Sequence, residues 1–215
     1  LYIDGYGLYG AVTVHQSTLS NNASSGISTG GGDSGGDHVF TFTDNTISDN
    51  GGTGLWGGAN GTQTITGNVL TYNGGHGIHT RGNGTYTISD NVSTDNGGRG
   101  VYGLYATHII SNNSIERNGG GVKVGQGGSY TISNNTITHN TATDGAGIDT
   151  LEAWSPSVSI ENNEITDNTC TDISCAAVTI FEPESGDPVF TLTGNNLSGN
   201  AASYIVRSAR TVARG

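Results

Sequence analysis

The chain repeats one short pattern of apolar and polar positions from near its first residue to near its last. In the clearest copy, residues 129–140, an aliphatic residue is followed by two polar residues, Asn, one polar residue, a second aliphatic, two polar residues and another Asn. Aligned on the first Asn, the copies recur at steps of 22 to 32 residues and share these anchor positions: Ser17, Asn45, Asn68, Asn91, Asn113, Asn135, Asn163 and Asn195. Five residues later every copy has a second Asn: Asn22, Asn50, Asn73, Asn96, Asn118, Asn140, Asn168 and Asn200.

Each copy contains three apolar positions. The first lies three residues before the anchor: Val14, Phe42, Ile65, Ile88, Ile110, Ile132, Ile160 and Leu192. The second lies two residues after it: Leu19, Ile47, Leu70, Ser93, Ile115, Ile137, Ile165 and Leu197. The third follows the second Asn, mostly after a small residue: Ile27, Leu55, Ile78, Val101, Val122, Ile148, Val178 and Ile205. Three short apolar segments in a period of about 22 residues predict a coil of three short strands.

The residues around these positions support an all-β interpretation. Thr, Ile, Val, Tyr and Phe favour strands, Gly and Asn separate the segments, and no helical period persists along the chain. Asn tolerates left-handed backbone angles, and identical Asn side chains in successive coils can bond amide to amide. The two Asn columns are therefore expected at the turns, with left-handed backbone and stacked side chains.

This pattern resembles the parallel β-helix repeat of the pectin-lyase-like superfamily over almost the whole chain. The resemblance implies an all-β, single-stranded right-handed parallel β-helix, a solenoid of about eight three-strand coils. It implies little about activity, because that superfamily spans lyases, hydrolases, epimerases, phage spikes and adhesins.

Length and composition restrict the alternatives. The 215 residues are expected to form one solenoid domain, 1–215, with incomplete coils at 1–14 and 201–215. No apolar run is long enough to span a membrane, and the net charge of −11 argues against nucleic acid as a partner. Cys170 and Cys175 flank a four-residue gap and are expected to form a disulfide, although two free thiols are the alternative. A disulfide indicates an extracellular or cell-surface protein.

The two ends of the sequence suggest self-assembly. Neither end carries a recognisable polar cap, and three of the seven basic residues lie in the last nine positions of an otherwise acidic chain. The first hypothesis is therefore a secreted, non-enzymatic structural β-helix that stacks head-to-tail on copies of itself into an extracellular filament or surface layer. The interface residues would be Leu1, Tyr2, Ile3, Leu8, Tyr204, Ile205, Val206, Arg207, Arg210 and Arg214. The competing interpretation is that 1–215 is a piece of a longer β-helix.

A second hypothesis comes from the residues that follow the third apolar position and should point to solvent. They form a column: Ser28, Trp56, His79, Tyr102, Lys123, Asp149 and Thr179, with Arg81 and Glu152 close in sequence. Aromatic rings beside charged groups are typical of polysaccharide-binding surfaces. For a lyase, epimerase or glycosidase the eligible catalytic residues are His79, Arg81, Tyr102, Lys123 and Asp149, and Trp56 and Tyr102 would contact the glycan.

The column also has a simpler interpretation as an ordinary solvated face. No superfamily catalytic signature is matched residue by residue, no Asp cluster suggests a metal site, and no cofactor is expected. His15, His76, His108 and His139 are scattered in the repeat and are likewise interpreted as solvated side chains.

Two further hypotheses are a surface adhesin fragment and an ice-binding solenoid. The second rests on Thr and Ser columns four and two residues before the anchor, which resemble those of ice-binding solenoids. Ile109, Glu161 and His15 interrupt these columns.

Overall fold

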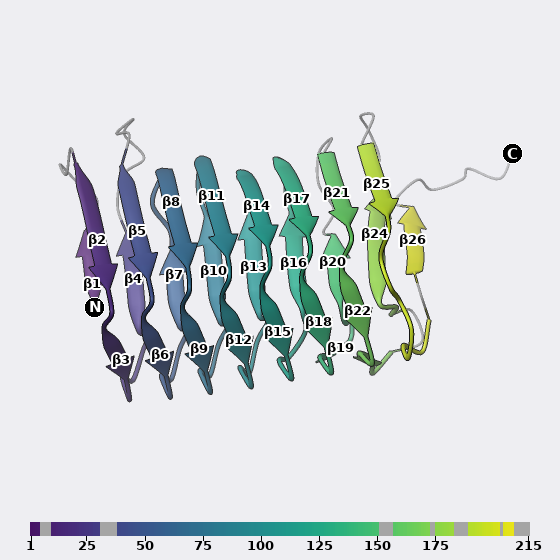
Figure 1. Cartoon of the computed structure of the whole chain (residues 1–215), viewed down its shortest axis with the longest axis horizontal. Coiled ribbons are helices and arrows are strands. Elements are labelled where there is room, and N and C mark those ends of the chain that lie inside the picture. The colour runs from purple at the N-terminus through teal and green to yellow at the C-terminus, as the bar shows by residue number, and fades with distance from the viewer. Residues whose placement is uncertain are drawn as a thin grey trace, which may run out of the picture.

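The computed structural model describes residues 1–4, 10–30, 38–150, 157–172, 175–182, 189–202 and 204–208. Within these ranges all regular structure is β-strand, and every strand pairing is parallel (Figure 1). The strands stack side by side along one axis, with the N-terminal strands at one end and the C-terminal strands at the other. Among the described residues no helix is long and apolar enough to cross a membrane.

Three long sheets and one short pair contain all the strands of the described ranges. Sheet A comprises β1 (Tyr2–Asp4), β4 (Ile27–Gly30), β7 (Leu55–Gly57), β10 (Ile78–Arg81), β13 (Val101–Leu104), β16 (Val122–Gly125), β20 (Ile148–Thr150), β24 (Val178–Glu182) and β26 (Tyr204–Ser208). Sheet B comprises β2 (Ala11–His15), β5 (Val39–Thr43), β8 (Gly61–Thr66), β11 (Gly84–Ser89), β14 (Thr107–Ser111), β17 (Ser129–Ser133), β21 (Ser157–Glu161) and β25 (Val189–Thr193). Sheet C comprises β3 (Thr18–Ser20), β6 (Thr46–Ser48), β9 (Val69–Thr71), β12 (Val92–Thr94), β15 (Ser114–Glu116), β18 (Thr136–Thr138) and β22 (Glu164–Thr166). The short sheet D pairs β19 (Thr141–Ala142) with β23 (Thr169–Cys170).

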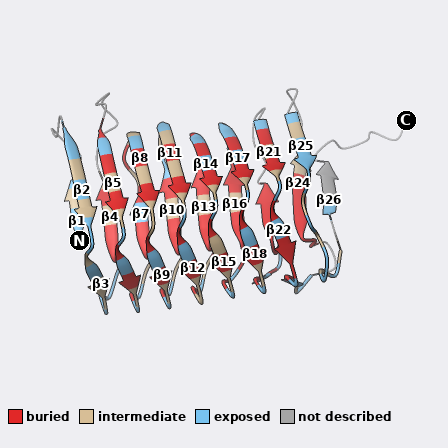
Figure 2. Cartoon of the chain, in the orientation of Figure 1, coloured by how far each residue is buried: buried red, intermediate tan, exposed pale blue. Residues whose placement is uncertain are grey.

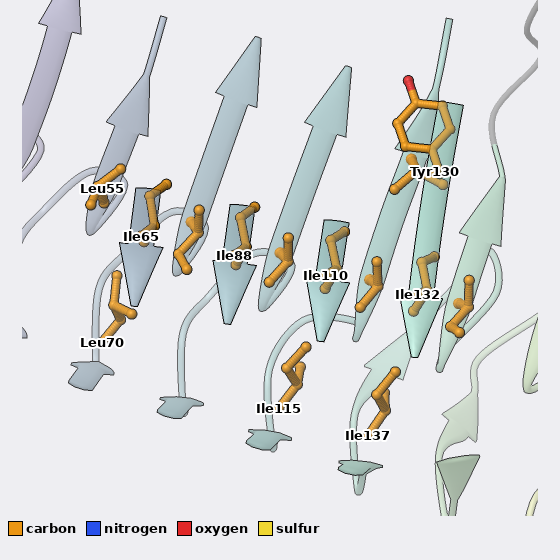
Figure 3. Packing of buried hydrophobic residues seen from close by; sticks show 14 of the residues in the cluster. Leu55, Ile65, Leu70, Ile88, Ile110, Ile115, Tyr130, Ile132 and Ile137 are labelled. Carbon is orange, nitrogen blue, oxygen red and sulfur yellow. The ribbon is translucent and has the colours of Figure 1, made fainter. Parts of the chain in front are cut away.

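The chain passes through sheets B, C and A in turn, so each circuit is one coil of a parallel β-helix. The expected fold is confirmed. The three apolar positions of the repeat lie in register in sheets B, C and A respectively, as shown by the pairs Ile88↔Ile110, Ile115↔Ile137 and Ile78↔Val101. Figure 3 shows Ile88, Ile110, Ile115 and Ile137 among the side chains inside the coils. Figure 2 shows that the buried residues run through the middle of the stack, whereas β1, β2, β3 and β25 at its ends contain none.

The last strand departs from the expected register. The sequence pattern aligns Ile205 with Val178, whereas the structure pairs Tyr204 with Val178. A shift of one residue exchanges the two faces of a strand, so Tyr204 takes the register position of the buried Val178. Tyr204 is nevertheless exposed, because β26 is the edge strand of sheet A in the described part of the chain. Of the expected assembly residues, Leu1 and Tyr2 are exposed and Ile3 packs against the core. Leu8, Arg210 and Arg214 lie outside the described residues, as do the side chains of Ile205, Val206 and Arg207.

Both Asn columns form the expected amide ladder. Each Asn before the last in its column donates from its side chain and its backbone N–H to the Oδ1 of the Asn in the next coil, for example Asn91 to Asn113 at 3.0 Å in both bonds. The expectation of left-handed backbone at these Asn residues is wrong. The left-handed residue is the one before, such as Asp90 (φ 58°) or Asn112 (φ 58°). That residue makes the bend, so the following Asn can turn its side chain inward and satisfy backbone carbonyls of the turn.

The interior also contains a polar stack that the apolar pattern did not predict. His108 is fully buried between Tyr86 and Tyr130, with ring centroids 4.8 and 5.3 Å away. Its Nε2 lies 2.8 Å from the Thr80 hydroxyl and its Nδ1 lies 3.3 Å from the Ala106 carbonyl oxygen. The interpretation of His108 as a solvated side chain is therefore wrong. The residue alternates inward on β14, two positions before the apolar Ile110.

Candidate functional site

The column Ser28, Trp56, His79, Tyr102, Lys123, Asp149 and Thr179 lies in register across sheet A. Its exposure falls along the axis: Trp56 is 40% exposed, whereas Asp149 is 4% and Thr179 is 1% exposed. The expectation that the whole column points to solvent is therefore wrong for Asp149 and Thr179. The turn that enters sheet A lengthens at residues 140–147, and it folds over the column. A methyl group on Gly145 would lie only 2.7 Å from Asp149 Cβ.

The rings of the column stack on one another. His79 and Tyr102 have centroids 4.7 Å apart and planes 23° apart, and Trp56 lies 6.4 Å from His79. His76 meets the edge of this stack, 5.4 Å from His79 and 5.0 Å from Tyr102. Because His79 and Tyr102 use their facing surfaces on each other, the flat surface left for a sugar ring is that of Trp56.

Next to the rings lies a buried cluster of three charged side chains. Lys123 Nζ is 2.7 Å and Arg99 Nη2 is 3.6 Å from Asp149 Oδ2. The carboxylate therefore holds the two cations together by charge. Side-chain exposure is 17% for Lys123 and 8% for Arg99. The two cations share the Asp149 carboxylate, and the charge of Asp144 also acts on Arg99.

Arg99 reaches across the coils to the inserted turn. Its Nη1 donates to the Gly145 carbonyl oxygen at 2.7 Å and its Nη2 donates to that of Asp144 at 2.5 Å. The path of the side chain is open because Gly120 has no Cβ: a methyl group there would lie 2.5 Å from Arg99 Cδ. Gly120 also has φ +132°, which disfavours other residues. Arg99 thus ties the inserted turn to the regular coils.

A hollow of about 560 Å³ opens beside this cluster. Its floor is backbone, because the turns that precede sheet A carry stacked glycines; a methyl group on Gly97 would lie 2.5 Å from the Gly74 carbonyl oxygen. The described residues that line the hollow are His76, Gly97, Gly98, Arg99, Tyr102, Gly119, Lys123, Thr141, Ala142, Thr143 and Thr171. Backbone, hydroxyls and two cations make this a site for a polar, anionic ligand.

The aromatic and imidazole groups of the site are neutral near pH 7. Burial lowers the pKa of His79 to about 4, with the nearby His76 and Arg81 adding to the effect. Burial, Arg99 and Lys123 lower the pKa of His76, whose Nδ1 accepts the Arg99 backbone N–H at 2.8 Å. Burial and the Asp149 carboxylate raise the pKa of Tyr102.

These shifts bear on proton abstraction. A general base works best with a pKa near the operating pH, whereas the pKa values of His79 and Tyr102 both move away from neutrality. His79 Nε2 is moreover buried without a hydrogen-bond partner, out of reach of a ligand in the hollow. The geometry therefore favours ligand binding over proton transfer by these two residues.

The sequence-predicted residues divide into two groups. Tyr102 and Lys123 line the hollow and Asp149 lies behind Lys123. Trp56, His79 and Arg81 lie outside the lining, and the Arg81 guanidinium instead covers the Tyr105 ring at 5.4 Å. Glu152 lies outside the described residues.

Arg99 and His76 line the site. Arg99 was missed from sequence, and the interpretation of His76 as a solvated side chain is wrong, because it is half-buried against His79 and Tyr102. Arg99 and His76 occupy the variable position of Asn-Gly-Gly-x-Gly turns, which is Thr53 in the preceding coil. A comparison of that position between coils reveals the two residues, because a charged or imidazole group in an otherwise glycine-rich turn departs from the repeat.

The disulfide between Cys170 and Cys175 is present, as expected. The hydroxyl columns of sheet B also lie in register, as in Thr64↔Thr87 and Ile109↔Thr131. Ice binding stays a prediction.

A comparison with protein families finds a match at residues 4–88 to the family described as periplasmic copper-binding protein (NosD). The described residues of this stretch do not fit a copper centre. No group of three or more His, Cys, Asp or Glu side chains with metal-binding geometry occurs among the described residues. His76 Nδ1 is occupied by the Arg99 backbone and His79 Nε2 is enclosed.

No curated protein and no solved structure matches the chain significantly. The model of the family described as right handed beta helix region matches residues 56–214, which is well over half of the chain. This agrees with the parallel stacking of sheets A, B and C. The chain belongs to the right-handed β-helix family.

Proposed function

We propose that this β-helix binds an acidic polysaccharide in the hollow of sheet A and along the column that leads to it. The observation that carries the proposal is that Arg99 and Lys123, two of only seven basic residues in a chain of net charge −11, both line one hollow. An anionic group in the hollow would meet both cations at a place where burial strengthens the interaction.

The surroundings suit a sugar polymer. Tyr102, Thr141, Thr143 and Thr171 offer hydroxyl groups to the same hollow. Trp56 offers an aromatic surface four strands from Asp149 in sheet A, at about 4.8 Å per strand. A linear ligand that follows the axis of the solenoid would meet both.

The proposal can be tested by titration calorimetry against a panel of polyuronates, hyaluronan and a neutral glucan. We expect binding to at least one acidic polymer and none to the neutral glucan. Lys123→Gln should weaken that binding at least about tenfold, because it removes one charged contact of a buried site.

The matched control is Arg117→Gln, which removes a cation paired with Asp95 on the exposed surface of the turn. It should leave affinity unchanged within about twofold. Circular dichroism checks that both variants fold, and the double variant Lys123→Gln with Asp149→Asn avoids an unpaired buried carboxylate. Absence of binding to every acidic polymer would refute the proposal.

We also propose that the protein works outside the cytosol, in the extracellular space or at the cell surface. The disulfide supports an oxidising compartment. Cell fractionation with thiol labelling would measure both the location and the oxidation state of the two cysteines.

End-to-end assembly is a second candidate, supported by the edge strands β1 and β26 of sheet A and by the exposed Leu1, Tyr2 and Tyr204. The topology makes a continuous joint difficult. Within one chain, a single strand of sheet A follows each strand of sheet B before the next strand of sheet B begins. If β1 of a second copy stacked on β26 of the first, two sheet A strands, β26 and β1, would lie between β25 of the first copy and β2 of the second. Negative-stain microscopy tests this candidate, and a rod that stays monomeric at micromolar concentration would contradict it.

A further inference from the structure

We infer that the hollow of sheet A receives the end of a polysaccharide chain and not an internal segment. This inference rests on the proposed function and specifies which part of the ligand is recognised. It comes from the shape of the surface along the axis of the solenoid. The surface is open on the N-terminal side of the hollow and closed on the C-terminal side.

The closed side begins where the column becomes buried. Trp56 is 40% exposed, Lys123 retains 17% exposure of its side chain, and Asp149 and Thr179 are 4% and 1% exposed. These residues occupy successive strands of sheet A, so the surface closes within about 10 Å along the axis.

Sheet D forms the wall that closes it. Thr141, Ala142 and Thr143 of the inserted turn at residues 140–147 line the hollow together with Thr171, which belongs to the corresponding turn of the next coil. The two turns are paired, with Thr171 N–H donating to the Ala142 carbonyl oxygen at 3.0 Å.

Three further contacts fix the wall. Arg99 holds the carbonyl groups of Asp144 and Gly145. The disulfide links Cys170 with Cys175, and Cys175 is buried against Ala142 and Ala146 in a small cluster of its own. The Arg99 hydrogen bonds, the disulfide and the packing of Cys175 therefore hold sheet D in place when a ligand contacts it.

The other side of the hollow is open. The turns that lead toward the N-terminus have Gly-Gly pairs at 51–52, 74–75 and 97–98, stacked through backbone hydrogen bonds such as Gly74 N–H to the Asn50 carbonyl oxygen and Gly98 N–H to that of Gly75. Because these positions carry no side chain, a polymer can lie along them next to the column. A chain placed there runs into sheet D one strand beyond Lys123, so its terminal residue is the one that meets Lys123 and Arg99.

The stoichiometry of binding tests this directly. The acidic polymer bound most tightly in the panel is cut into short oligomers, long oligomers and intact chains, and each is titrated into the wild-type protein. End recognition predicts one protein per chain at every length. Recognition of internal segments predicts that the number bound per chain grows in proportion to length, and this result would overturn the inference while leaving the proposed function intact. No binding at any length would refute the proposed function itself.

A second measurement identifies the end. Borohydride reduction alters only the reducing end, and 4,5-unsaturation of the last residue alters only the non-reducing end. We expect one of the two changes to lower affinity at least about tenfold. Affinity unchanged by both would contradict end recognition.

A variant localises the effect to the wall. Thr143 is exposed and lines the hollow, so Thr143→Trp should fill the space where the chain end sits without disturbing the core. Thr107→Trp places the same ring at an exposed position of sheet B and is the matched control. We expect the first variant to lose at least about tenfold in affinity for short oligomers and the second to lose none. Equal affinity of the two variants would contradict the assignment.

Discussion

Replacing Asn113 by alanine should destabilise the protein far more than replacing an exposed asparagine. Asn113 lies in the middle of the amide ladder and is buried. Its Oδ1 accepts the backbone and side-chain N–H groups of Asn91, both at 3.0 Å. Its Nδ2 donates to the carbonyl oxygens of Ile88 and Ser111 and to Asn135 Oδ1, at 2.9, 3.0 and 2.9 Å.

The size of the effect follows from what the substitution leaves behind. The Asn91 backbone N–H, between β11 and β12, loses its acceptor, and the Ile88 carbonyl loses its amide donor. Each buried group without a partner costs about 1–3 kcal/mol, so we expect a loss of about 4 kcal/mol in the free energy of unfolding. The matched control Asn83→Ala removes an exposed side chain and should cost under about 1 kcal/mol.

A second substitution tests the direction of the ladder. Asn113→Asp keeps the shape but replaces the Nδ2 donor by an oxygen, which would face the Ile88 carbonyl and Asn135 Oδ1 at about the same 2.9 Å. We expect Asp to be at least as destabilising as Ala at neutral pH, because a buried carboxylate then meets only acceptors on that side.

Guanidinium unfolding followed by far-UV circular dichroism measures all three variants against the wild type. The reasoning would be refuted if Asn113→Ala and Asn83→Ala unfolded within about 1 kcal/mol of each other, or if Asn113→Asp were as stable as the wild type.

Three further predictions concern other parts of the fold. Burial lowers the pKa of His108 to about 4, so between pH 6.5 and 4 the unfolded state binds a proton at this residue and the folded state does not. The free energy of unfolding should therefore fall by about 3 kcal/mol over this range. His108→Phe should reduce this pH dependence when unfolding is measured at several pH values. Gly120→Ala should cost at least about 1 kcal/mol more than Gly127→Ala in thermal unfolding, because both glycines have positive φ but only the first would place a methyl group against Arg99. Reduction of Cys170–Cys175 should cost about 2 kcal/mol and speed hydrogen exchange in sheet D while leaving the central coils unchanged, because each coil contacts only its neighbours.

The inward positions of the repeat could be predicted from sequence because every coil must bury side chains at the same three positions. An aliphatic in one coil must stack on an aliphatic in the next, so the pattern is visible as a period. The exceptions are also local: Ser93 replaces an aliphatic in sheet C and is accommodated by donating its hydroxyl to the Gly100 carbonyl oxygen at 3.1 Å.

The site was only partly predictable. The column of sheet A could be read from the period, and so could the positions of Tyr102, Lys123 and Asp149 in it. Their burial could not, because it depends on where an inserted turn folds. Arg99 is 45 residues from Asp144 in sequence, and nothing in the repeat indicates that its side chain crosses the coils to reach that carbonyl.

The same division explains how this solenoid can carry a specific site. Inward columns and amide ladders are nearly uniform between coils, so they fix the backbone of each turn whatever its outer residues are. The outer residues can then differ: His76 and Arg99 occupy equivalent turn positions in successive coils, and each supplies a different group to the same hollow. The inserted turn adds what the period cannot supply, a boundary across the axis. The inward columns and amide ladders therefore determine stability, and the residues that depart from the repeat determine what the surface binds. Substitutions in the ladders should change the free energy of unfolding, and substitutions of the outer residues should change ligand affinity, each without the other.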